Sequence, residues 1–547
     1  MGHKYTLNND KMPIILTGVL SALIFAGIYG IKILNPFYTE WLLNGGDLTQ
    51  HYLGWLAFRE SDWHFPIGMV DTLAYPNLTS VIFTDSIPIC AVIFKLLNPI
   101  LPFDCQYFGI WGIACFILQG ILTAKIINKY TSNNIAIILC SLLSVLTPAM
   151  ILRMYMHTSL GAQWILIYCL GLLINKDKYE ENKKIYLHIA LIGLLSAGIH
   201  MYFVLMCGII IAGIYLIDIL ENKRIKRGLL ILADYVLIAG CVTGFLGGFN
   251  SGMSSKDIGL GYFSFNLNEF YNPQGWSCIL PDRSLIVDGQ WEGFAYLGIG
   301  FLILLIVAVI LVIINHDLRK SIAQHRKMAI TMCIVFAVSL VLALSPIVTI
   351  SDKVLVEIPI TERISDIWSV FRATGRIIWP CIYIIEICSF IILVKHIRKV
   401  GVLITILAAS LILQIIDIHV VLAQRYEVFG TRVEFDTPLD TEEFWNIIAE
   451  DEHIKHVVYY KMPDQAYMYP LTYWAMANDK TVSNFYFARS IQDKVNECRN
   501  VSLSELPEDS IFVFPEDTDT DSLEYDLNYY HIDHLIIGYI NEFSVPN

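Results

Sequence analysis

The chain has 547 residues, of which 55% are hydrophobic and 16% charged, and its mean hydropathy is +0.56. This composition is too apolar for a soluble, disordered or fibrous protein and indicates a membrane protein. The net charge of −13 is unevenly placed, because residues 421–547 hold 24 acidic and 8 basic side chains while residues 1–420 hold 26 and 29. We therefore divide the chain into an apolar membrane domain, 1–420, and an acidic, water-compatible domain, 421–547. This charge pattern argues against a nucleic-acid partner.

The membrane domain contains apolar segments near the length of about 20 residues that a spanning helix needs. They are 13–34, 106–127, 133–152, 157–175, 186–200, 202–220, 228–248, 294–314, 328–349, 376–394 and 400–420. The sequence thus predicts a polytopic α-helical membrane protein with about 11 transmembrane helices. Most of the twelve cysteines lie in these apolar runs without CxxC spacing, so we expect buried thiols with neither a zinc site nor a disulfide framework. We predict no cofactor, and no pattern in the sequence supports a divalent metal.

The basic residues predict the orientation of these spans, because Lys and Arg favour cytoplasmic loops. Eleven spans and a cytoplasmic N-terminus place all six basic clusters of the membrane domain in the cytoplasm, and the C-terminal domain outside. The segment 87–102 is short, contains Lys95 and three prolines, and is interpreted as an interfacial or re-entrant helix on the outer side. We expect external loops at 35–105, 249–293 and 350–375, in a multi-pass protein of the cytoplasmic membrane.

The first external loop contains a pattern typical of a catalytic carboxylate. Asp47, Gln50 and His51 are spaced i, i+3 and i+4, so a helix beginning near Asp47 would carry them on one face. Asp47 could accept a proton from an attacking hydroxyl, or it could only cap the helix. Three apolar side chains are expected to face lipid from the same helix: Leu48, Tyr52 and Trp55.

Further polar residues fall at the predicted outer ends of the spans. Asp85 precedes the segment 87–102, where it could cap a helix or orient a second polar group. Arg153, His157 and His200 lie in turns too short to form a domain, and suit an anion such as a phosphate. The alternatives are snorkelling of Arg153 to lipid head groups and helix-end hydrogen bonds of the histidines.

Two later segments predict sugar and phosphate binding. The loop 249–293 interleaves aromatic rings with amides and acids, which suits the apolar face and the hydroxyls of a sugar, although an interfacial aromatic belt is the alternative. The candidate sugar or acceptor contacts in this loop are Tyr262, Asn266, Asn268, Gln290, Trp291 and Glu292. Arg372 and Arg376 are spaced i, i+4 and could clamp a lipid-linked phosphate, or anchor a helix at phospholipid head groups.

Several segments carry a resemblance to the GT-C superfamily of integral-membrane glycosyltransferases, and more closely to a bacterial family of GT-C-like membrane proteins. They are GGDLTQHYLGW, TDSIP, GYFSFNLNEFYNPQGW, GQWEGFAYLG, FRATGR and the tail segment Asn484 to Arg489. The resemblance implies a polyprenyl-phosphate sugar donor, transfer on the outer side of the membrane, and an acidic residue in the first external loop, here Asp47. The wider superfamily often has a second acid beside the first, which Asp47 lacks in the sequence.

The acidic domain, 421–547, contains short β-branched and aromatic runs between helical stretches, which predict a small extracytoplasmic α/β domain. Its acidic run 508–526 lacks EF-hand spacing and is interpreted as a solvated loop.

The combined hypothesis is a membrane glycosyltransferase with Asp47 as general base and Arg372, Arg376 and Arg153 at the donor phosphate. Its expected partners are a polyprenyl-phosphate sugar, an acceptor glycan or glycolipid, the bilayer, and the enzymes that make and flip the donor. The alternatives are a transporter or flippase of a lipid-linked saccharide, using Glu386 and Asp234 within spans as proton relays, and a non-catalytic assembly or sensor protein.

Overall fold

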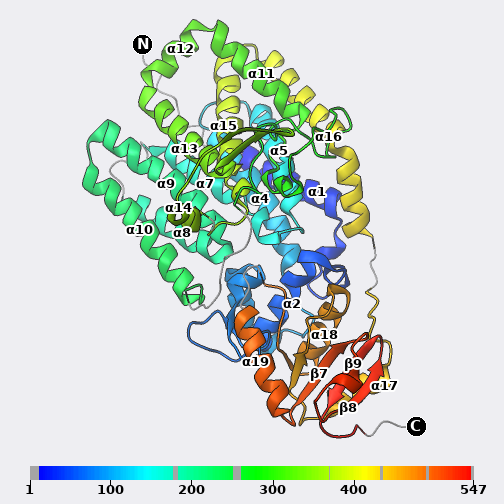
Figure 1. The fold of residues 1–547 in the computed structure, drawn as a ribbon. Helices are drawn as coiled ribbons and strands as arrows, with labels where there is room; N and C mark the ends of the chain where they lie inside the picture. The colour runs from blue at the N-terminus through cyan, green and yellow to red at the C-terminus, as the bar shows by residue number, and fades with distance from the viewer. Residues whose placement is uncertain are drawn as a thin grey trace.

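The computed structural model describes residues 11–176, 183–249, 260–368, 370–431, 435–487 and 492–543. Arg489, one end of the tail segment named above, lies outside these residues. Figure 1 shows a helical domain with a small sheet domain at one end and helix α12 at the other. The site described below lies near the sheet-domain end.

The helical domain confirms a polytopic membrane protein. Among the described residues, seven helices are long and apolar enough to cross a bilayer, and the bent pair α11 (Ile299–Ile314) and α12 (His316–Gln324) adds an eighth if it counts as one span. The seven are α1 (Met12–Tyr29), α4 (Phe108–Ile127), α9 (Met201–Asn222), α10 (Ile225–Phe245), α13 (Arg326–Leu344), α15 (Trp379–His396) and α16 (Val400–Gly430).

The remaining apolar segments form helices that are too short to count as spans by their length. Fewer than the predicted 11 helices are therefore long enough to cross a bilayer. The segment 133–152 is broken into α5 (Asn134–Val145) and α6 (Pro148–Arg153), because Pro148 lacks the N–H that would continue the first helix. The segment 157–175 is divided into a 3-10 turn, η5 (Thr158–Gly161), and α7 (Trp164–Ile174), and the segment 186–200 forms α8 (Lys184–Ile199).

The first loop folds into short elements: η1 (Lys32–Leu34), η2 (Glu40–Leu42), α2 (Gly46–Glu60), the hairpin β1 (Met69–Val70) and β2 (Thr79–Ser80), η3 (Val81–Thr84), α3 (Pro88–Leu96) and η4 (Asn98–Ile100). Helix α3 has nine residues and is about 14 Å long, too short to cross a bilayer. The prediction that Leu48, Tyr52 and Trp55 face lipid is wrong, because α2 is enclosed by protein and all three are buried.

Helix α16 extends beyond its predicted end at residue 420 to Gly430. Its last turns are held by aromatic packing, since the Phe429 ring lies 5.6 Å from Tyr29 and 5.9 Å from Trp41. The predicted boundary at 420/421 therefore falls inside a helix. The sequence becomes more polar after residue 420, which ends the apolar segment, but the helix continues to Gly430.

The C-terminal domain is a small α/β unit, as predicted. Its strands form one sheet in the order β6-β5-β7-β9-β8, with β6, β5 and β7 parallel and β9 and β8 antiparallel to their neighbours. The elements are α17 (Glu442–Glu450), β5 (His456–Tyr459), α18 (Gln465–Ala477), β6 (Thr481–Val482), α19 (Gln492–Glu505), β7 (Ser510–Pro515), η9 (Thr520–Ser522), β8 (Asn528–Ile532) and β9 (Leu535–Tyr539). The interpretation of residues 508–526 as a solvated loop holds only in part, because residues 510–515 form the buried strand β7. The acids that follow this strand, Glu516, Asp517 and Asp519, are exposed.

This domain is bonded directly to the first loop. Tyr75 N donates to Val482 O at 3.1 Å and Val482 N donates to Thr72 O at 2.8 Å, so the loop pairs with the strand β6. The Tyr75 ring stacks on the imidazole of His456, with ring centres 3.5 Å apart. These contacts fix the domain against the segment that follows α2.

Candidate functional site

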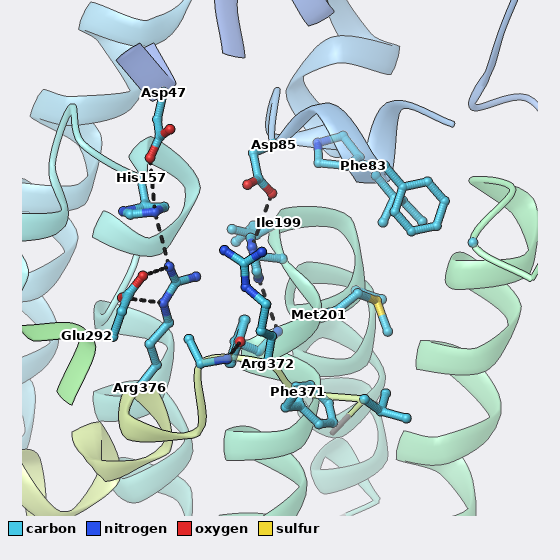
Figure 2. A pocket seen from close by; sticks show the side chains of 18 of the residues that line it. Asp47, Phe83, Asp85, His157, Ile199, Met201, Glu292, Phe371, Arg372 and Arg376 are labelled. Carbon is cyan, nitrogen blue, oxygen red and sulfur yellow. Dashed lines mark hydrogen bonds and ion pairs between the residues drawn. The ribbon is translucent and has the colours of Figure 1, made fainter. Parts of the chain in front are cut away.

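A cavity of about 480 Å³ lies where the first loop, the bundle and the C-terminal domain meet. Figure 2 shows its polar side chains converging from several elements that are far apart in the sequence. The predicted site residues that line it are Asp47, Gln50, Asp85, His157, His200, Trp291, Glu292, Arg372 and Arg376. The fold therefore brings both predicted acids of the first loop and both predicted arginines of the segment 350–376 to one cavity.

Asp47 lies in the first turn of α2, directly after two glycines with positive φ. Gly45 and Gly46 have φ values of 90° and 68°, which other residues rarely adopt, so the Gly-Gly pair is what allows this helix entry. Gly45, and not Asp47, is the N-cap residue. The Asp47 carboxylate instead contacts His157, with Oδ2 and Nε2 3.2 Å apart, and its side chain stays 38% exposed. These contacts favour a functional role for Asp47 over helix capping.

His157 connects Asp47 to a buried group of two arginines and one glutamate. Its Nε2 lies 3.0 Å from Arg376 Nη2 and its Nδ1 lies 3.2 Å from Arg153 Nη1. Glu292 accepts from Arg376 at 2.5 and 2.8 Å and pairs with Arg153 at 2.8 Å. Burial, followed by Arg376 and Arg153, lowers the pKa of His157 well below its usual value, so this imidazole is neutral.

The two acids that the first loop contributes to the cavity, Asp47 and Asp85, have opposite pKa shifts. Burial raises the pKa of Asp47, the nearby Asp85 charge raises it further, and Arg376 lowers it in part. Burial also raises the pKa of Asp85, but His200, which lies 3.1 Å from its Oδ1, outweighs this together with His51 and His157, so the net shift is downward. The surroundings therefore favour the ionised form of Asp85 and disfavour the ionised form of Asp47.

Asp85 is held by structure as well as by charge. It adopts a left-handed conformation, φ 55°, and helix α3 begins only at Pro88 with Ile87 as its N-cap. The helix-cap interpretation of Asp85 is therefore wrong. His200 Nδ1 accepts from Tyr202 N at 3.1 Å, which leaves Nε2 to donate to Asp85. The tertiary structure thus brings Asp85 to the same cavity as Asp47, although the two acids are far apart in the first loop.

The two arginines of FRATGR do not share one helical face, contrary to the prediction. Arg372 lies in a bend, whereas Arg376 lies in the 3-10 turn η8 (Thr374–Ile378), so no single helix carries both residues. A side chain at Gly375 would meet Gly293, whose Cα lies 2.7 Å from an ideal Cβ position. Arg376 is buried against Glu292, whereas Arg372 is exposed, with its guanidinium 4.9 Å from the Phe263 ring centre.

Two predicted residues lie behind the cavity and do not line it. Arg153 is 1% exposed and its guanidinium lies between the rings of Trp291 and Trp379, so it supports Glu292 and is not placed to contact a phosphate. His51 is fully buried, with Nδ1 3.3 Å from Thr158 Oγ1, because it faces the bundle and not the cavity. Burial lowers the pKa of His51 to about 4.

The predicted sugar-binding amides form the interior of their own loop. Asn266 donates to Gln290 Oε1 at 3.0 Å, Gln290 donates to Thr349 Oγ1 at 2.7 Å, and Asn268 donates to Ser351 Oγ at 3.1 Å. All three amides are fully buried and none lines the cavity, nor does Tyr262, which is 42% exposed. The structure does not bring these residues to the cavity, and it uses the amides for hydrogen bonds to one another and to Thr349 and Ser351.

One side of the cavity is lined by apolar residues, which the sequence did not predict to be part of the site. Its apolar lining includes Phe83, Ile199, Met201 and Phe371, and Figure 2 shows Phe83 and Met201 on the side away from Asp47 and Glu292. Apolar residues are frequent throughout the chain, so no sequence signal separates these from the core. Tyr486 of the C-terminal domain also lines the cavity, and its position within the NFYFAR segment was the one available signal.

Among the described residues, no group of three or more His, Cys, Asp or Glu side chains is arranged to hold a metal ion. A search of curated proteins found no match. A family model described as a domain of unknown function, DUF6311, matches residues 18–419, and the DUF6311 C-terminal domain matches residues 444–540. The two matches fall on the helical domain and the sheet domain, and together they cover most of the chain. The chain therefore belongs to the DUF6311 family.

Proposed function

We propose that this protein is a GT-C-type membrane glycosyltransferase that moves a sugar from a polyprenyl-phosphate donor to an acceptor glycan. The observation that carries the proposal is the cavity itself, which places a partly exposed carboxylate of raised pKa, a basic side chain and an apolar wall around one space. A lipid-linked sugar phosphate has three matching parts: a sugar, an anionic phosphate and a hydrocarbon chain.

In the proposed reaction Asp47 accepts the proton of an acceptor hydroxyl while that oxygen attacks the anomeric carbon of the donor sugar. The bond between this carbon and the phosphate oxygen breaks, and polyprenyl phosphate leaves with the electron pair. Attack from the face opposite the phosphate inverts the configuration. A phosphate is a good leaving group, so the protein's main tasks are to orient both substrates and to balance charge.

Arg372 is the side chain proposed to contact the donor phosphate. It is exposed and lines the cavity, whereas Arg376 and Arg153 share the carboxylate of Glu292. The two buried arginines and Glu292 together carry a net charge of +1, and this charge favours an anion in the cavity. Neither buried arginine offers an exposed guanidinium that could bind the phosphate directly. The apolar wall, which includes Met201 and Phe371, and the nearby lining residue Phe249 suit the first isoprene units of the donor.

Transport of a lipid-linked saccharide is the alternative, and the structure gives it less support. Glu386, one of the two acids considered above as proton relays, accepts hydrogen bonds from Ser144 and Thr147 at 2.9 and 2.7 Å and lies apart from the cavity lining. Asp234, the other acid, does not line the cavity either. Because both carboxylate oxygens of Glu386 accept hydrogen bonds from hydroxyl groups of neighbouring helices, a structural role is enough to explain this residue.

The proposal also includes a place in the cell. We propose the cytoplasmic membrane, with the C-terminal domain and the cavity on the outer face and basic loops in the cytoplasm. A glycosyltransferase that makes the lipid-linked donor and a flippase that delivers it would then act before this protein.

Lipid analysis of cells that lack the protein tests the proposal. We expect one polyprenyl-phosphate sugar to accumulate and the same sugar to disappear from a surface glycan. Complementation with the wild-type chain should reverse both changes, and complementation with Asp47→Asn should reverse neither. Unchanged lipids and glycans would contradict the proposed activity, and movement of the lipid across liposomes without sugar transfer would favour the transporter.

A further inference from the structure

A second cavity, of about 570 Å³, lies between the helices α4, α7 and α8. Its volume is within the range of about 300–1,000 Å³ that is usual for small-molecule sites. Helix α8 extends from one cavity to the other, because Lys184 at its start lines the second cavity and Ile199 at its end lines the first. The rise of a helix separates these two residues by about 22 Å, so the second cavity lies at the end of the bundle remote from Asp47.

Three lysines give the second cavity a basic lining. Lys125 is in the last turn of α4, Lys129 follows that helix, and Lys184 begins α8. Lys125 and Lys184 are exposed and Lys129 is half-buried, and none of the described residues that line this cavity is acidic. Three ammonium groups around one space favour a ligand with several anionic oxygens, such as a phosphate.

A specific polar contact builds the wall of this cavity between α7 and α8. The Tyr168 hydroxyl and His188 Nδ1 lie 2.5 Å apart, and both side chains line the cavity. Each residue belongs to a different helix, so their contact holds the two helices together beside the lysines.

The remaining wall of this cavity is apolar. Leu122 and Ile126 lie one turn apart on α4, and Ile167 of α7 also lines the cavity. A soluble phosphate has no group that gains from such a wall, whereas the acyl chain of a phospholipid would leave water by lying against it. The combination of lysines and an apolar wall therefore matches a lipid with an anionic head group.

We propose that this basic cavity binds the phosphate-bearing head group of an anionic phospholipid, with the start of an acyl chain against Leu122, Ile126 and Ile167. Basic pockets between membrane helices are a known mode of binding anionic head groups. In the orientation proposed above, the lipid belongs to the cytoplasmic leaflet. The binding is independent of the proposed sugar transfer, and its test requires neither a sugar nor a donor.

Lysines at the ends of membrane helices have a second explanation, which is the preference of basic residues for the cytoplasm. That preference requires no cavity, and it applies equally to Lys226 in α10 and Lys320 in α12. Both are exposed, neither lines the second cavity, and α12 lies at the end of the bundle opposite the sheet domain (Figure 1). These two lysines therefore serve as matched controls.

Native mass spectrometry of the full chain in detergent, titrated with lipid, measures the proposed binding. We expect dioleoyl phosphatidylglycerol to bind at least about tenfold more tightly than dioleoyl phosphatidylcholine, which has the same chains and no net charge. Lys125→Gln combined with Lys129→Gln should weaken phosphatidylglycerol binding about tenfold, and the corresponding double substitution by Arg should preserve it. Lys226→Gln combined with Lys320→Gln removes the same charge and should bind like the wild type.

A variant of a different helix separates loss of the site from a local change in α4. Lys184→Gln, at the start of α8, should weaken phosphatidylglycerol binding several-fold with an unfolding temperature close to that of the wild type, because this lysine is exposed.

Three results would overturn the proposal: equal affinity for the two lipids, wild-type affinity in the Lys125→Gln and Lys129→Gln double variant, or an equal loss in the control double variant. Titration with pyrophosphate distinguishes the two sources of a phosphate. Binding of pyrophosphate that depends on Lys125 and Lys129, without a preference between the lipids, would overturn the lipid and assign the cavity to a soluble anion.

Discussion

Asp47 is the residue on which the proposed chemistry depends, and its substitution is the most direct test. Asp47→Asn keeps the size of the side chain and removes the proton acceptor, so we expect transfer to fall at least about 100-fold. The unfolding temperature should stay close to that of the wild type, since the carboxylate is partly exposed. Asp62→Asn, an exposed acid of the same loop, is the control and should keep full transfer. Transfer by Asp47→Asn at the wild-type rate would remove Asp47 as the base.

The raised pKa of Asp47 predicts the acid limb of the pH–rate profile. A base works only when deprotonated, so kcat/KM should fall as the pH drops through the Asp47 pKa. Because burial and Asp85 raise that pKa, the fall should be centred above the usual value of an aspartate. Asp85→Asn removes one raising charge and should move the limb to lower pH. Measuring kcat/KM against pH for both proteins checks the direction of this shift.

Glu292 is expected to stabilise the fold, and this contribution can be measured without an assay of sugar transfer. Glu292→Gln would leave Arg153 and Arg376 buried without their shared carboxylate, so we expect a loss of about 3–5 kcal/mol in the free energy of unfolding. Glu221→Gln breaks the more exposed pair with Lys176 and should cost about 1 kcal/mol or less. Denaturant unfolding in detergent measures both, and equal losses would contradict the role assigned to Glu292.

Among the elements, the turn η8 depends on the absence of a side chain at Gly375. Gly375→Ala would place a Cβ against Gly293 and Ser264, shifting η8 relative to η7 (Asp288–Gly293) and moving Arg376 away from Glu292. We expect a loss of stability of about 1–3 kcal/mol and reduced transfer. Gly401→Ala, where nothing lies within 4 Å of the added Cβ, is the matched control and should be neutral or slightly stabilising. Thermal unfolding and transfer assays on both variants separate a local clash from a general effect of alanine.

For the whole molecule, charge and fold together predict an orientation in the membrane. The C-terminal domain and α12 lie at opposite ends of the helical domain, so one should be outside the cell and the other inside (Figure 1). A cysteine introduced at Asp517 should react with a membrane-impermeant maleimide in intact cells. A cysteine at Ser321 in α12 should react only after the membrane is opened, and the unmodified chain gives the background. The reverse pattern would place the cavity on the cytoplasmic side.

The sequence by itself predicted a polytopic helical membrane protein, the positions of its longest apolar helices and a small C-terminal α/β domain. These depend on composition and periodicity, which are local properties. The same reasoning identified Asp47, Asp85, His157 and Arg376, because charged side chains at the ends of apolar segments are costly and therefore stand out.

Only the tertiary structure decided which of these residues meet and what each one does. It paired Asp47 with His157 and Asp85 with His200, and it moved Arg153 behind Glu292, through contacts between segments as much as 139 positions apart in the chain. It also turned the amides of Asn266 and Gln290 inward, because buried polar groups must be satisfied wherever the chain places them. The pKa difference between the two acids likewise arises from burial and neighbouring charges, which local sequence patterns do not specify.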